Sequence, residues 1–270
     1  MPEYIGPSGF IFLRVGGAVL LFWIVAFFVN SEKVRRKDLG RMAICGFFGV
    51  AANQLLFFNG LNITTPINAA IMMTTNPILV LIAASIILKT RVTVRKVSGI
   101  FLGLIGALGL IAFGKKFGFG SDTLSGDLLV FMNAMSYGVY LVLVKPLMKK
   151  YAPITVIKWV FLFGFIYVIP FGSQQFSIVD WNSFPTHIWW ETAFVVIATT
   201  FFAYLLNIFA LKKVEPSVVS IYIYSQPLLA ALVAISLGND SLDMNKIISA
   251  ILIFVGVFLV SGPTKQGQRA

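Results

Sequence analysis

Nine apolar segments, each long enough to cross a lipid bilayer, follow one another through this chain of 270 residues. A helix needs about 20 mainly apolar residues to span the hydrocarbon core. Only 11% of the residues are charged, against about a quarter in a typical soluble domain, so a soluble fold could not cover its surface. The expected fold class is therefore an all-α integral membrane protein. The expected spans are 8–29, 41–60, 67–88, 96–113, 126–147, 153–171, 189–211, 217–237 and 246–262.

Lysine and arginine are distributed unevenly between the short loops that join these segments. If the loop after the first span is cytoplasmic, sixteen of the 21 basic residues fall on that side. Lys115, Lys116 and Lys246 fall on the other side, and Arg14 and Lys158 lie within spans. Cytoplasmic loops of membrane proteins carry such an excess, so the pattern predicts an outer N-terminus and a cytoplasmic C-terminus. The net charge of +11 is explained by topology, and no nucleic acid is expected as a partner.

The chain contains an internal repeat. A shift of 150 residues aligns Pro66 with Pro216 and Pro77 with Pro227, without a gap over some fifty residues. The basic segment 89–96 then aligns with 239–246, which is mostly acidic or neutral, so the two loops are expected on opposite sides of the membrane. This predicts an inverted repeat of five-helix halves, at 1–113 and 126–262, with a solute site between them near the midplane.

The paired prolines have different positions within their spans. Pro66 and Pro216 come at the start of a span, where a missing N–H has no cost. Pro77 and Pro227 come a third to halfway along, where each should bend or break the helix. Backbone groups freed in this way are tolerated in a membrane where they meet protein or line a wet cavity.

The repeat also predicts a tenth helix. The partner of span 126–147 would occupy about 20 residues before Pro7, and this sequence does not contain them. We therefore expect that the first helix of a ten-helix fold is missing here, through a late start codon, a truncation or a genuine loss.

Two stretches resemble the EamA family of the drug/metabolite transporter superfamily, as does Pro7 followed by Arg14. They are "TTNPILVLIAASIILKTRVTVRKVSGIFLGLIGALGL" from Thr74 and "YSQPLLAALVAISLG" from Tyr224. The resemblance implies two inverted halves, a central cavity and transport of small metabolites by alternating access, often as export. The family commonly has a glutamate shortly before the loop that follows the proline-containing span, and here only Asp240 could replace it.

Polar side chains within the spans are the candidates for a substrate-binding cavity. Arg14 is the only arginine well inside a span, and Asn76 and Gln226 each precede a mid-span proline. Asn133, Tyr137 and Tyr140 share one helical face. Each of these residues could instead have a packing role: it could anchor a helix at the membrane interface, sit at a helix kink or form an interhelical hydrogen bond. The candidates are Arg14, Asn53, Gln54, Asn76, Pro77, Asn133, Tyr137, Tyr140, Tyr204, Asn207, Tyr222, Gln226 and Pro227.

The sequence offers no machinery for a membrane enzyme. We find no paired carboxylates deep in the spans, no metal-ligand cluster and one cysteine, Cys45, so neither a metal nor a cofactor is expected. The expected function is a secondary transporter of a small organic metabolite in the bacterial inner membrane. Its expected partners are that metabolite and the lipid bilayer, and a homodimer stays open. The alternatives are a non-transporting receptor or assembly subunit, and a truncated, inactive transporter.

Overall fold

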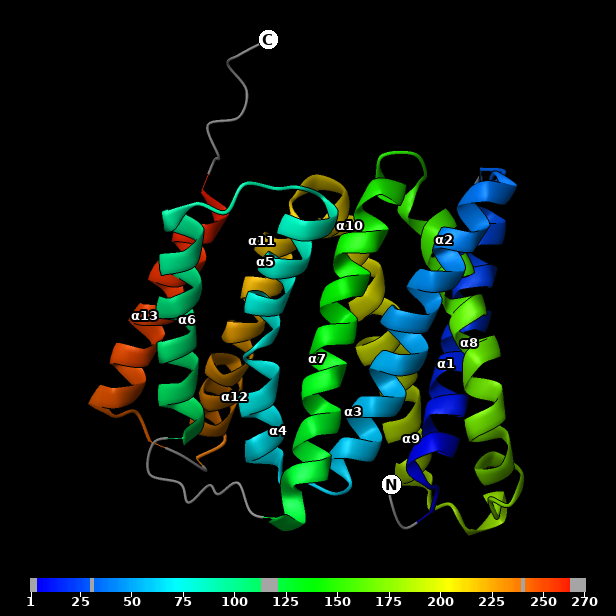
Figure 1. Ribbon diagram of the computed structural model, residues 1–270. Helices are drawn as coiled ribbons and strands as arrows, with labels where there is room; N and C mark the ends of the chain where they lie inside the picture. Colours follow the sequence, from blue (N-terminus) through cyan, green and yellow to red (C-terminus); the bar gives the residue numbers. More distant parts are fainter. Residues whose placement is uncertain (1–3, 30–31, 113–120, 239–240, 263–270) are drawn as a thin grey trace.

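The computed structural model describes residues 4–29, 32–112, 121–238 and 241–262, which form nine helical spans joined by short loops (Figure 1). This confirms the expected all-α membrane protein. Five spans are single helices, and the other four are each built from two helices in sequence. The helices are α1 (Pro7–Phe28), α2 (Arg36–Gly46), α3 (Asn53–Leu61), α4 (Pro66–Met73), α5 (Asn76–Ile87), α6 (Val94–Ala112), α7 (Ser121–Met148), α8 (Pro153–Ser177), α9 (Thr186–Phe194), α10 (Ala203–Lys213), α11 (Pro216–Ile221), α12 (Ser225–Ser236) and α13 (Met244–Ser261).

Both mid-span prolines follow a break in their helix, as the sequence predicted. The chain turns at Thr74 and Thr75 between α4 and α5, and passes through a 3₁₀ turn at Tyr222–Tyr224 between α11 and α12. Pro77 and Pro227 then stand in the first turn of the following helix, where the missing N–H has no cost. Each span therefore consists of two half-helices that meet inside the membrane.

Two further spans contain a π-helical segment that the sequence did not predict. Phe47–Ala52 joins α2 to α3, and Val195–Phe202 joins α9 to α10. A π segment inserts extra residues into a helical turn and so changes the face that the next turn presents, and such segments are frequent at functional sites. The two segments lie at matching positions under the 150-residue shift, since 47–52 corresponds to 197–202.

Close helix pairs form the two edges of the bundle. α6 packs on α13 at one edge and α1 packs on α8 at the other, while α7 lies between them (Figure 1). A Cβ added to Gly99 would lie 2.8 Å from the Gly256 carbonyl oxygen, so the glycines bring the α6 and α13 backbones into contact. The spacing of Gly99 and Gly103, four residues apart on α6, is typical of closely packed helices in membranes.

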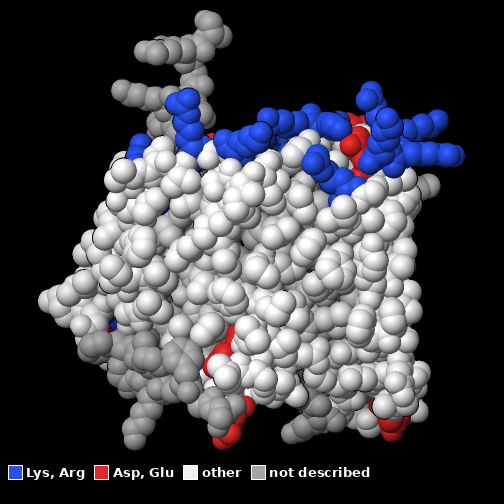
Figure 2. Space-filling model, in the orientation of Figure 1, with Lys and Arg blue, Asp and Glu red and all other residues white. Residues whose placement is uncertain are grey.

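Charged side chains are separated to the two ends of the bundle. Figure 2 shows lysines and arginines gathered along one end, a broad uncharged belt, and acidic groups at the opposite end. Large apolar side chains such as Leu20 and Phe27 are 66% and 85% exposed, which suits contact with lipid. By the positive-inside rule the basic end is cytoplasmic. Lys115, Lys116, Lys265 and Arg269, used above to assign the topology, lie outside the described residues.

Candidate functional site

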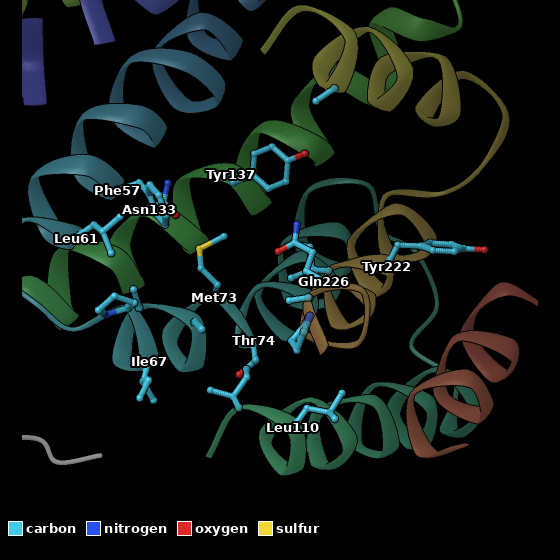
Figure 3. Close-up of a pocket in the computed structure, with 18 of the residues that line it drawn as sticks. Phe57, Leu61, Ile67, Met73, Thr74, Leu110, Asn133, Tyr137, Tyr222 and Gln226 are labelled. Atoms are coloured by element: carbon cyan, nitrogen blue, oxygen red, sulfur yellow. The ribbon is translucent and has the colours of Figure 1, made fainter. Parts of the chain in front are cut away.

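A cavity of about 1350 Å³ lies at the centre of the bundle, where the broken spans meet (Figure 3). Its walls come from α3 and α4 on one side and from α10, α11 and α12 on the other, with α7 and the end of α6 between them. Ten of the thirteen candidates from the sequence line it. They are Arg14, Asn53, Gln54, Asn133, Tyr137, Tyr204, Asn207, Tyr222, Gln226 and Pro227.

The π segments place the polar residues of two cavity walls. Asn53 and Gln54 follow the first segment directly, and Tyr204 follows the second by one residue. The 150-residue shift aligns Gln54 with Tyr204, so equivalent positions of the two halves face the same cavity. The Tyr204 hydroxyl lies 3.2 Å from the Asn53 Oδ1 atom and 3.2 Å from the Gly49 carbonyl oxygen, which connects the two walls.

α7 contributes a second group of amide and phenol side chains. Asn133 donates through Nδ2 to the Asn53 carbonyl oxygen at 2.5 Å, and Asn207 donates to the Tyr137 hydroxyl. The Oδ1 atoms of Asn133 and Asn207 are buried without a hydrogen-bond partner in the described structure. The Gln54 amide, beside the Tyr204 hydroxyl, makes no hydrogen bond of normal geometry and is 3% exposed. Buried polar groups without partners are costly, so these atoms indicate a place for a polar ligand or water.

Arg14 enters the cavity from α1. Its Nε donates to the Thr200 hydroxyl at 2.5 Å, and its Nη2 donates to the Thr199 carbonyl oxygen at 3.3 Å. Both acceptors belong to the second π segment, where the altered helix pattern frees carbonyl groups. The guanidinium also lies over the Phe58 ring, with Cζ 5.3 Å from the ring centre. These contacts hold the charge in the cavity wall.

Three candidates do not line the cavity. Asn76 is fully buried and donates through Nδ2 to the Ala134 carbonyl oxygen at 2.7 Å, which ties α5 to α7. Pro77 is buried beside it at the start of α5. The matching residue Gln226 faces the cavity instead, because α5 packs closely on α7 whereas α12 packs more loosely, on α6.

Tyr140 shares a helical face with Tyr137 but belongs to the core. It is 2% exposed, and a Cβ added to Gly49 would clash with its ring. Its ring centre is 5.8 Å from that of Tyr137. The seven-residue separation from Asn133 carries it one turn beyond the cavity and into the packing against the first π segment. Tyr222 lines the cavity but is 54% exposed, and its ring extends away from Gln226 in Figure 3.

The sequence reasoning missed several residues around the cavity. Thr199 and Thr200 were not candidates, because only the π segment turns them toward Arg14. Asp127, near the start of α7, was not a candidate either. It is 3% exposed and accepts from the Thr64 hydroxyl and, at 3.2 Å, from Asn68 Nδ2. Asp240, which the family resemblance singled out, lies outside the described residues.

The two ends of the cavity differ. Its lining reaches the acidic end at Asp243 and Lys246, which form an ion pair of 2.8 Å. Lys246 holds the pKa of the exposed Asp243 carboxyl below its usual value by donating hydrogen bonds from its side chain and its backbone. Among the described residues, the basic side chains of the cytoplasmic end do not line the cavity. There Lys96 on α6 pairs with Glu215 before α11 at 2.6 Å.

A solved structure and several curated proteins resemble this chain. The structure, described only as "Crystal structure of protein", superposes with a TM-score of 0.79 over 95% of this chain and 89% of its own, at 17% identity, and so shows the fold alone. "Uncharacterized transporter YyaM" of Bacillus subtilis (strain 168) is 28% identical, covering 96% of this chain and 86% of that protein. An "Uncharacterized transporter" of Archaeoglobus fulgidus is 27% identical over 83% of this chain and 77% of its own length.

The family model described as "EamA-like transporter family" matches residues 1–112 and 124–262, which is most of the chain. The matched regions contain every helix that contributes to the cavity. The chain therefore belongs to the EamA-like transporter family and is a multi-pass membrane protein of the transporter class.

Proposed function

We propose that this protein is a secondary transporter that moves a small organic metabolite across the bacterial plasma membrane by alternating access. The observation that carries the proposal is the central cavity of about 1350 Å³, which is lined by polar groups at mid-membrane and reaches one end of the bundle. Ligand pockets commonly measure about 300–1,000 Å³, so a metabolite and some water fit within this volume.

The extent of the cavity supports an outward-facing state. The cavity lining includes Asp243 and Lys246 at the end opposite the basic belt, which is the outer end by the positive-inside rule. At the cytoplasmic end, Lys96 and Glu215 connect α6 to the start of α11. Lys145 of α7 donates to the Leu211 and Val214 carbonyl oxygens at 2.5 and 2.7 Å. Of these contacts, the ion pair between Lys96 and Glu215 joins the two proposed halves, and it would have to separate for the cavity to open inward.

The repeated local distortions support two related halves that move against each other. The π segments and the proline breaks recur at a separation close to 150 residues, although few of the aligned residues are identical. Inverted repeats of this kind commonly rock around a fixed site near the midplane. The halves proposed here are 1–113 and 126–262.

One relative suggests the direction of transport. The "Probable terminal-alkyne amino-acid exporter" of Streptantibioticus cattleyicolor is 26% identical over 61% of this chain and 54% of its own length. We therefore propose export of the metabolite from the cell.

Flux through purified protein in liposomes tests the proposal. The liposomes are loaded with a bacterial metabolite extract, and the solutes that leave them are identified by mass spectrometry. Liposomes that contain the extract but no protein, called empty liposomes below, give the background release. Ala70 lines the cavity, so Ala70→Trp should fill it and abolish the flux. Leu20 is 66% exposed on α1, so Leu20→Trp adds the same side chain at the lipid-facing surface and should leave the flux intact.

Selective release in the wild type that survives Leu20→Trp and disappears in Ala70→Trp is the expected outcome. Binding of extract components without release would instead indicate a receptor. Equal release from wild-type, Ala70→Trp and empty liposomes would refute transport.

A further inference from the structure

The cavity wall carries one positive charge that no carboxylate of the described structure balances. Three charged residues line the cavity, and two of them, Asp243 and Lys246, pair with each other at the mouth. In the described structure, the third, Arg14, contacts a hydroxyl, a backbone carbonyl and an aromatic ring. We propose that the solute carries a carboxylate that binds the Arg14 guanidinium, an inference that rests on the transport function proposed above.

The guanidinium retains unused donors. An arginine side chain has five N–H donors. The protein uses one on Nε and one on Nη2, which leaves three N–H groups on the two terminal nitrogens. Two parallel N–H groups match the two oxygens of a carboxylate, and such bidentate pairs are among the strongest hydrogen bonds in proteins.

The neighbours of Arg14 fix its position without neutralising it. Phe58 covers one face of the guanidinium, and the Thr200 hydroxyl and Thr199 carbonyl hold its inner edge. A side chain held in this way loses little rotamer freedom when an anion arrives. A surface arginine, by contrast, loses conformational entropy when it binds an anion, and this loss weakens the contact.

The charge balance selects the class of anion. An unpaired charge within a membrane is costly, and an anion that enters the cavity removes that cost. One guanidinium balances one negative charge, so a monocarboxylate leaves the site neutral, whereas a doubly charged phosphate ester would leave a negative charge buried. A cation would add a second positive charge beside Arg14.

The other wall favours a solute that also donates hydrogen bonds. The buried Oδ1 atoms of Asn133 and Asn207 are acceptors without partners. Asn133 is connected to Tyr204 through Asn53, so these acceptors belong to the same polar wall of the cavity. These atoms expose almost no surface, so a hydroxyl or another neutral donor on the solute would satisfy them after a turn of the amide side chains toward the cavity. The structure therefore fits a hydroxylated or amidated organic monocarboxylate.

The test uses full-length protein in liposomes loaded with the metabolite extract, either untreated or after methyl esterification of its carboxylates. The variants are Arg14→Gln, which removes the charge at similar size, and Arg14→Lys, which keeps the charge but loses the planar fork. The matched control is Arg91→Gln, since Arg91 is exposed on the cytoplasmic loop between α5 and α6 and does not line the cavity. Gel filtration and thermal melting verify the fold of each variant.

We expect the wild type and Arg91→Gln to release mainly carboxylates, and to lose this release after esterification. Arg14→Gln should slow carboxylate release by about tenfold or more, and the release rate of Arg14→Lys should lie between those of the wild type and Arg14→Gln. If Arg14→Gln does not fold, the loss or persistence of wild-type release after esterification decides the question.

Two results would overturn the inference. Release of neutral, cationic or esterified compounds, or of carboxylates at an unchanged rate from folded Arg14→Gln, would refute a carboxylate bound to Arg14 while leaving transport intact. Absence of any selective release would refute the transport function and the inference together.

Discussion

The ion pair between Lys96 and Glu215 makes a quantitative prediction about the closed cytoplasmic end. The Lys96 side chain is 6% exposed and the Glu215 side chain 36% exposed, and their charged atoms are 2.6 Å apart. A hydrogen bond between charged groups contributes about 1.5–3 kcal/mol when buried. Because Glu215 is partly solvated, we reduce this to about 1–2 kcal/mol. Glu215→Gln should therefore shift the equilibrium toward the inward-open state by about five- to thirtyfold.

Thiol labelling from the cytoplasmic side measures this shift. Met73 lines the middle of the cavity, so Met73→Cys reports access once the buried Cys45 has been replaced by alanine. An impermeant maleimide is added to inside-out vesicles, and the labelling rate is compared with and without Glu215→Gln. The expected result is a rate increase of about five- to thirtyfold.

Lys150→Gln is the matched control. Lys150 forms a 2.8 Å ion pair with Asp38 at the same end of the bundle, between the start of α2 and the segment after α7, and neither residue lines the cavity. Its loss should leave the labelling rate unchanged. The reasoning fails if Glu215→Gln changes the rate less than twofold, or if Lys150→Gln raises it equally.

Three substitutions separate packing from transport. Gly99→Ala should lower stability by about 1–3 kcal/mol, because its Cβ would press on the α13 backbone. Gly40 is exposed within α2 and its added Cβ meets nothing within 4 Å, so Gly40→Ala should leave the melting temperature in detergent unchanged or raise it. Asp127→Asn should lower the melting temperature, because an amide nitrogen would face the Thr64 or Asn68 donors. An unchanged melting temperature would contradict a role for Asp127 in holding α4 to α7. Gln226→Leu should reduce flux at unchanged stability, since Gln226 faces the cavity; loss of stability without a specific loss of flux would assign it to packing.

The residues that determine class and topology could be recognised from the sequence. Segment length and hydropathy depend on composition alone, and the positions of basic residues in short loops are independent of helix packing. The breaks before Pro77 and Pro227 were also predictable, because the lost N–H and the ring clash act locally. Most of the polar residues within the spans that the sequence offered as candidates lie in the cavity wall, since lipid excludes them from the outer surface.

The choice among those polar residues depended on neighbours far away in the sequence. Asn76 and Gln226 occupy equivalent places before a proline, yet one binds the α7 backbone and the other lines the cavity. Tyr137 and Tyr140 share a helical face, but only Tyr137 lines the cavity. The difference arises because packing against α7 and the first π segment covers one member of each pair.

The sequence by itself determined a nine-span membrane protein with proline-broken helices, because a bilayer constrains segment length, backbone satisfaction and charge locally. Only the tertiary structure decided which side chains meet at the centre. The π segments turn Gln54 and Tyr204 toward the cavity, and the second one supplies the Thr200 hydroxyl and Thr199 carbonyl that bind Arg14. Those π segments have no signature in the residues that form them, because the packing of one helix on another stabilises the extra residue in the turn.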